Sequence, residues 1–125
     1  MALRIRWSSE ITVPGGPTLS FSRAISVDGT DLMTAHLEPG ESAAVDVQPS
    51  AAEQVRVLMV TSTAYGEDLT YRVGSSTQDV ALDSPQVFAG AGMIGRLPTD
   101  PQTLTFTNGL AEAATVTILA GRTIA

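Results

Sequence analysis

The sequence contains no cysteine and no lysine in its 125 residues. Without cysteine the chain can form no disulfide bond, no thiolate metal site and no thiol nucleophile. Without lysine it has no amine for Schiff-base chemistry and no lysine clamp for phosphate. All seven cations are therefore arginines, whose planar guanidinium groups suit partly buried ion pairs at interfaces. Codon usage in a GC-rich genome is the alternative explanation for the missing lysines.

Charged residues are also few, at 16% of the chain against about 25% in ordinary globular domains. The net charge of -6 disfavours sequence-independent nucleic-acid binding, because such binding needs clustered cations. A free protein of this size usually carries more surface charge. We therefore expect neighbouring subunits to cover part of the surface. A compact, Ser- and Thr-rich monomer is the alternative.

Long apolar runs are missing as well. No segment approaches the ~20 apolar residues that a transmembrane helix needs, so we expect no membrane partner. Residues 1–7 carry charge inside their only apolar run, so they lack the apolar centre of a secretory signal. We expect a chain of this kind to reach an extracellular place only within an assembled particle, or after processing.

The sequence does show alternation of apolar and polar residues at a period of two. The clearest example lies within residues 18–27, in the file Leu19, Phe21, Arg23, Ile25 and Val27. Alternation of this kind is typical of strands that turn one file of side chains to a core and the other to water or a partner. Similar files at 55–59 and 69–73 indicate an all-β chain.

Turn residues divide the chain into about eight or nine short strands. We expect strands at 3–7 (extending toward residue 13), 18–27, 30–37, 54–63, 69–73, 78–82, 103–107 and 115–120, and a helical turn at 49–53. The spacing predicts one domain over residues 1–125. Its fold class is all-β, a two-sheet antiparallel β-sandwich that is jelly-roll-like or immunoglobulin-like. Periodicity alone does not give the strand order.

Residues 37–47 read LEPGESAAVDV. This stretch resembles the L-x-P-G-E-S-x-x-V-x-V hairpin that is common in immunoglobulin-like and other β-sandwich domains. The resemblance supports a sandwich and implies no activity.

Two segments come close to motifs of enzymes without completing them. Residues 90–95 match G-x-G-x-x-G, but Pro98 lies where the following helix would run, and the positions near residue 115 are threonine and valine. Residues 40–44 are one glycine short of a nucleophile elbow and lie in a turn. The only histidine, His36, lies in a predicted strand. We therefore predict that the protein is not an enzyme and has no cofactor.

The acidic residues are scattered through the predicted turns, where aspartate commonly bonds to local backbone. Asp28 and Asp31 are the best candidates for a calcium site, but no D-x-D-x-D-G run is present. We assign no metal, and calcium near these two residues stays an open alternative.

Aromatic residues are few, and three of the six, Phe21, Tyr71 and Phe106, lie on predicted core files. Trp7 and Tyr65 are left as candidates for an exposed sugar platform. The alternative to an assembly protein is therefore a β-sandwich module that binds carbohydrate or a receptor.

Small all-β chains of this composition resemble the capsid decoration (cement) proteins of bacteriophages. The resemblance is one of composition and architecture and includes no diagnostic motif. It implies a virion structural subunit that forms a homo-oligomer, with a trimer favoured, and clamps neighbouring capsid proteins. It implies no nucleic-acid partner and no membrane.

Six residues are the candidate interface of such a subunit. Trp7, Phe88 and Met93 would supply apolar contacts, and Arg4, Arg6 and Arg96 would supply ion pairs.

The glycine- and proline-rich segment 85–101 contains three of these six residues. We expect it to be an irregular loop or a short edge strand that contacts a partner.

Overall fold

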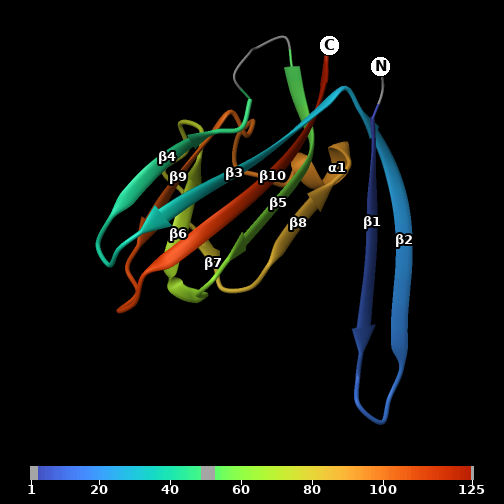
Figure 1. Cartoon of the computed structure of the whole chain (residues 1–125), viewed down its shortest axis with the longest axis horizontal. Coiled ribbons are helices and arrows are strands. Elements are labelled where there is room, and N and C mark those ends of the chain that lie inside the picture. Colours follow the sequence, from blue (N-terminus) through green and yellow to red (C-terminus); the bar gives the residue numbers. More distant parts are fainter. Residues whose placement is uncertain (1–2, 49–52, 125) are drawn as a thin grey trace.

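Figure 1 shows the computed structural model, which describes residues 3–48 and 53–124. Two strands form an arm, and eight form a sandwich of two four-stranded sheets. The arm consists of β1 (Leu3–Thr12) and β2 (Thr18–Val27). The sandwich contains β3 (Gly29–Leu37), β4 (Ser42–Asp46), β5 (Glu53–Ser62), β6 (Gly66–Val73), β7 (Val80–Leu82), β8 (Gln86–Ala89), β9 (Thr103–Asn108) and β10 (Ala114–Ile124), with one helical turn, α1 (Ala91–Ile94).

The strands of the sandwich pair in nested order. β3 pairs with β10, β4 with β9, β5 with β8 and β6 with β7, all antiparallel. Further pairing of β10 with β5 and of β6 with β9 completes the sheets β3-β10-β5-β8 and β4-β9-β6-β7. A long hairpin rolled up in this way is a jelly roll. The predicted all-β sandwich is confirmed, and the strand order is that of the jelly-roll alternative.

The core lies between the inner faces of the two sheets. Alternate residues of the central strands, such as Val116 and Ile118 of β10 and Leu104 and Phe106 of β9, are fully buried there. The ring of Tyr71 packs against that of Phe106 at a centroid distance of 5.3 Å. These strands behave as the alternation predicts, because each has a second apolar layer opposite its inner face.

Asn108 is the one buried polar residue among those that the structure describes. Its Nδ2 donates to the carbonyls of Leu37 at 3.0 Å and Glu112 at 2.9 Å. Its Oδ1 accepts from the backbone N–H of Leu110 at 3.0 Å. Burial is tolerated because these bonds satisfy the amide, and they hold the β9–β10 loop over the end of the sandwich.

The arm is a hairpin that projects from the sandwich as a separate two-stranded sheet (Figure 1). Its ten residue pairs run in continuous register from Leu3 opposite Val27 to Thr12 opposite Thr18. At its tip, the Val13 N–H donates to the Pro17 carbonyl at 3.0 Å. At ~3.3 Å per residue the arm is about 33 Å long.

Bonds to the end of β10 hold the base of the arm. Asp28, between β2 and β3, donates its N–H to the Arg122 carbonyl at 2.7 Å and accepts the Ile124 N–H on Oδ2 at 2.8 Å. Ile5 and Val27 pack over Gly121, where an added Cβ would lie 2.5 Å from Ile5 Cδ1 and 3.2 Å from Val27 Cγ1. The chain therefore leaves the sandwich at a defined place.

The apolar file of residues 18–27 was expected to reach a core, and for Phe21 this is wrong: its side chain is 44% exposed on the arm. No second layer covers that part of the arm. Segment 85–101 contains the short edge strand β8, as predicted, followed by the helical turn α1, which was not predicted. The helical turn predicted at 49–53 falls mostly outside the described residues.

Candidate interaction surface

The arm has one apolar face and one polar face. Directly paired residues share a face, so every odd-numbered residue of β1 and β2 lies on the same side. Five of the eight large hydrophobic side chains that are exposed in the described residues belong to the arm and its turn: Leu3, Ile11, Val13, Leu19 and Phe21. Contiguous exposed apolar surface of this kind marks interaction sites more often than scattered single residues do.

An aromatic pair forms the middle of this arm face. The rings of Trp7 and Phe21 meet edge to face at a centroid distance of 4.9 Å and an interplanar angle of 89°. Arg23 lies directly opposite Trp7 and is exposed. Large aromatic side chains with a neighbouring arginine are the composition typical of the centre of protein interfaces.

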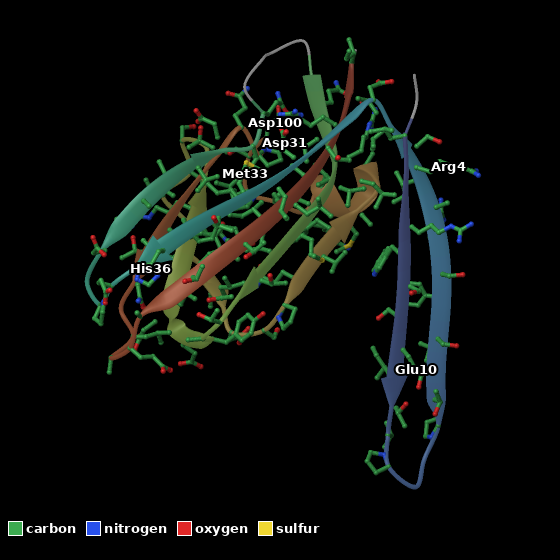
Figure 2. The ribbon with its side chains drawn as sticks, viewed as in Figure 1. Arg4, Glu10, Asp31, Met33, His36 and Asp100 are labelled. Atoms are coloured by element: carbon green, nitrogen blue, oxygen red, sulfur yellow. The ribbon has the colours of Figure 1, made fainter. Side chains whose placement is uncertain are left out.

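The opposite, polar face of the arm contains mostly serine, threonine and charged residues. Arg4 and Arg6 are exposed on this face, and Figure 2 shows Arg4 on the side of the arm turned away from the sandwich. The predicted contacts Arg4, Arg6 and Trp7 thus lie on one element but not on one face.

A second exposed apolar feature crosses the outer face of the sheet β3-β10-β5-β8. The strand registers place Leu119 beside both Leu32 and Met59, and Met59 beside Val87. None of these four side chains belongs to the core cluster or packs against it. Leu32 is 69% exposed, and the other three are half-buried. We call this set the apolar row: Leu32, Leu119, Met59 and Val87.

The outer face of the other sheet, β4-β9-β6-β7, is polar by comparison. Ser42 and Thr107 share a hydrogen bond of 3.0 Å, and the Thr103 hydroxyl donates to Asp46 at 3.0 Å. Arg72 and Asp79 form an exposed ion pair at 2.7 Å. The two outer faces therefore differ in chemistry, and only the one beside the arm carries an apolar row.

The remaining predicted contacts lie near the junction of β8 and α1. Met93 is 44% exposed on α1, and Arg96 is exposed just after it. Phe88 is half-buried and packs against the core, so it offers less surface than expected. Sequence reasoning did not single out Ile11, Leu19 or Leu32 as contacts.

A hollow of about 440 Å³ separates the middle of the arm from the end of β8. Trp7 and residues 23–26 line it from the arm, and Ala89 and Gly90 from the sandwich. The middle of the arm is therefore separated from the sandwich by an open space.

A hydroxyl, an imidazole and a carboxylate meet at His36. Its Nδ1 lies 2.9 Å from Thr115 Oγ1, and its Nε2 lies 3.1 Å from Glu38 Oε1. His36 and Glu38 are exposed at the end of β3 (Figure 2 labels His36), and Thr115 lies beside His36 on β10. The three groups are therefore joined by hydrogen bonds at the surface of the protein, where the imidazole and the carboxylate are in contact with water.

The two candidate calcium ligands have other partners. Asp28 accepts the Ile124 N–H, and Asp31 pairs with Arg122. No group of three or more side chains suited to a metal gathers in residues 3–48 and 53–124. In the same ranges, no helix is long and apolar enough to cross a membrane.

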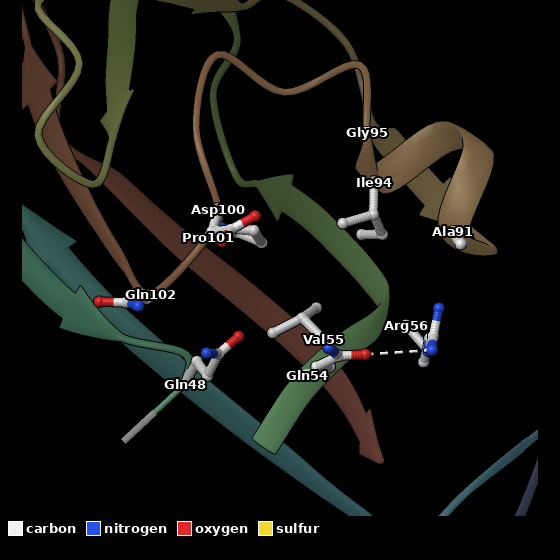
Figure 3. Close-up of a pocket in the computed structure, with 10 residues that line it drawn as sticks. All are labelled: Gln48, Gln54, Val55, Arg56, Ala91, Ile94, Gly95, Asp100, Pro101 and Gln102. Atoms are coloured by element: carbon white, nitrogen blue, oxygen red, sulfur yellow. Dashed lines mark hydrogen bonds between the residues drawn. The ribbon is translucent and has the colours of Figure 1, made fainter. Parts of the chain in front are cut away.

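A second hollow, of about 320 Å³, opens at the end of the sandwich below α1 (Figure 3). Gln48, Gln54, Gln102 and Asp100 line it, together with Arg56, whose Nη2 donates to Gln54 Oε1 at 3.1 Å. Its described lining includes no aromatic side chain, so it lacks the stacking surface expected of a sugar site.

Comparison with protein-family models, curated proteins and solved structures found no match to this chain.

Proposed function

We propose that the protein is a structural assembly subunit that stabilises a larger particle through protein–protein contacts. The observation that carries the proposal is the arm, a ribbon of about 33 Å whose apolar face is exposed over most of its length. Exposed apolar surface of this kind lowers the solubility of a free monomer, and its burial against a partner is favourable.

The finer proposal is a virion accessory protein of the capsid-decoration type, acting as a homo-oligomer with a trimer favoured. The jelly roll supports it only by analogy, since this fold occurs in viral capsid proteins and also in lectins and cupins. The low charge content and the arginine-only cations are consistent with surfaces that neighbours cover.

The alternative is a module that binds carbohydrate or a receptor. Trp7 lies on the arm, whereas Tyr65 packs against the core and accepts the Ser62 N–H at 3.0 Å. The hollows lined by Trp7 contain arginine and small side chains but no described carboxylate. No specific feature therefore favours a sugar site.

Sedimentation of particles from the source culture tests the proposal. We expect the chain to sediment with them at a fixed ratio to the main shell protein, and particles stripped of the chain to rebind the purified protein. Leu19→Glu places a charge on the apolar face of the arm and should abolish rebinding, whereas the neighbouring Ser20→Glu, on the polar face, should not. A chain that stays at the top of the gradient in every preparation refutes the proposal.

A further inference from the structure

We propose that the occupant of the apolar row is the arm of a second copy of this chain. The inference rests on the proposed assembly function and specifies its contact. The apolar face of one copy's arm lies across the row Leu32, Leu119, Met59 and Val87 of the next copy. Each copy would then give its arm to one neighbour and its row to another.

The two surfaces match in chemistry and in size. Both are apolar, both lack a covering layer, and both contain side chains more than 60% exposed: Ile11 and Leu19 on the arm and Leu32 on the row. Four strands at ~4.8 Å spacing make the row about 14 Å wide, well within the ~33 Å length of the arm. The apolar row runs across the strands and therefore provides an apolar contact surface for an arm that packs over it.

Charge complementarity indicates a second copy rather than two arms packing together. The arm region, residues 1–27, has three arginines and one glutamate, a balance of +2. Residues 28–125 have four arginines and twelve acidic residues, a balance of -8. Arm-to-sandwich contact between copies brings together two regions of opposite net charge, whereas arm-to-arm contact brings together two regions of like net charge and the two exposed Arg23 side chains.

A copy's own arm is anchored beside its apolar row. Its base packs over Gly121, and the register places Gly121 beside Thr30 and Val57, one row away from Leu32 and Leu119 on the same face. From there the arm projects away from the sandwich (Figure 1). The arm base and the apolar row are thus adjacent on one face of the sheet. The surface that a neighbour's arm would bury is therefore continuous with the surface that the copy's own arm base already buries.

The small area of one arm-to-row contact also indicates that each subunit makes two such contacts. One face of a ribbon about 33 Å by 10 Å gives a footprint of roughly 330 Å². Stable interfaces bury about 800 Å² per partner, so a single arm contact is too small alone. The row is only about 14 Å wide, so the two contacts of a copy together stay below this area. An assembly therefore needs both contacts, as in a closed ring or a reciprocal pair.

The mass in solution of four full-length variants tests the contact. Leu19→Glu disables the arm, and Leu32→Glu disables the row. Ser20→Glu on the polar face of the arm and Ala44→Glu on the outer face of the other sheet are matched controls, since both positions are exposed. Sedimentation equilibrium should give a multiple of 13.0 kDa for the wild type and both controls. The first two variants should associate at least ~100-fold more weakly.

Mixing the two defective variants gives the sharper result. The intact arm of Leu32→Glu can still dock on the intact row of Leu19→Glu, so the mixture keeps one of the two contacts. We expect it to associate more strongly than either variant alone and more weakly than the wild type. If Leu19→Glu dissociates the assembly but Leu32→Glu does not, the arm docks elsewhere and the inference fails. A wild type that stays monomeric while still sedimenting with particles also refutes it and leaves the proposed function standing.

Discussion

Tyr71 is the side chain whose ionisation folding changes most clearly. It is fully buried, and its hydroxyl donates a hydrogen bond of 2.6 Å to Gln86 Oε1. Burial raises the pKa of Tyr71 from 10.0 to about 12, because the phenolate would lose its hydration. The chain has no lysine or cysteine, and arginine stays charged, so tyrosine hydroxyls are the side chains that titrate in this range.

We expect the free energy of unfolding to fall between pH 10 and pH 12. In this window the unfolded chain releases the Tyr71 proton while the folded chain retains it, so stability is intact below pH 10 and decreases by about 3 kcal/mol toward pH 12. Urea unfolding at a series of pH values measures the slope. Tyr71→Phe should flatten it, and Tyr65→Phe should keep it. A slope that survives in Tyr71→Phe would show that another group is responsible.

Among the elements, the arm is held to the sandwich at its base, by the hydrogen bonds of Asp28 and by the packing over Gly121. Strands of the sandwich are held by neighbours in the sheet and by a facing layer, whereas β1 pairs only with β2. Ile5 and Val27 are the arm residues that pack over Gly121, together with Val57 of β5. The absence of a Cβ at residue 121 lets the arm approach the sheet closely.

Gly121→Ala should loosen the arm while leaving the sandwich folded. The new Cβ would lie 2.5 Å from Ile5 Cδ1, so the Ile5 side chain must move away from residue 121. We expect backbone amides of β1 and β2 to exchange with solvent roughly 10-fold faster, with a loss of at most about 1 kcal/mol in the stability of the sandwich. Gly29→Ala is the control, since an added Cβ there meets nothing within 4 Å. Equal exchange in both variants would mean that this packing does not hold the arm.

At the scale of the whole molecule, the chain divides into a well-packed jelly roll and a poorly covered ribbon. The sandwich buries apolar side chains from both of its sheets, but the arm buries only Val27 completely. Two-stranded ribbons without a second layer are marginally stable in water. The stability of the arm should therefore depend on what covers it.

The only tryptophan, Trp7, lies on the arm, so its fluorescence reports on the arm alone. In dilute, monomeric protein we expect its urea transition to precede the loss of far-UV circular dichroism from the sandwich. A Trp7→Phe/Phe88→Trp variant moves the probe to a residue packed against the core, and its transition should coincide with the circular dichroism. Coincident transitions in the wild type would show that arm and sandwich unfold as one unit.

Particular residues show how far the sequence alone reaches. Phe21 and Phe106 lie in equally regular alternating files, yet Phe106 is fully buried and Phe21 is 44% exposed. The exposed apolar side chain Leu32 could not be recognised either, because its partners in the apolar row come from strands far away in the chain. The available signal was the Arg23 inside the apolar file of β2, which is unusual for a core position.

The alternation of side chains and the turn residues determined the all-β class, most strand positions and the break at residues 14–17, because the direction of a side chain along a strand is a local property. Tertiary structure decided the nested strand order, the projection of the arm and the assembly of the apolar row. Burial needs a second layer, and that layer comes from residues distant in sequence. Local periodicity therefore shows that a strand has an apolar face, and only the packed molecule shows whether the face is covered.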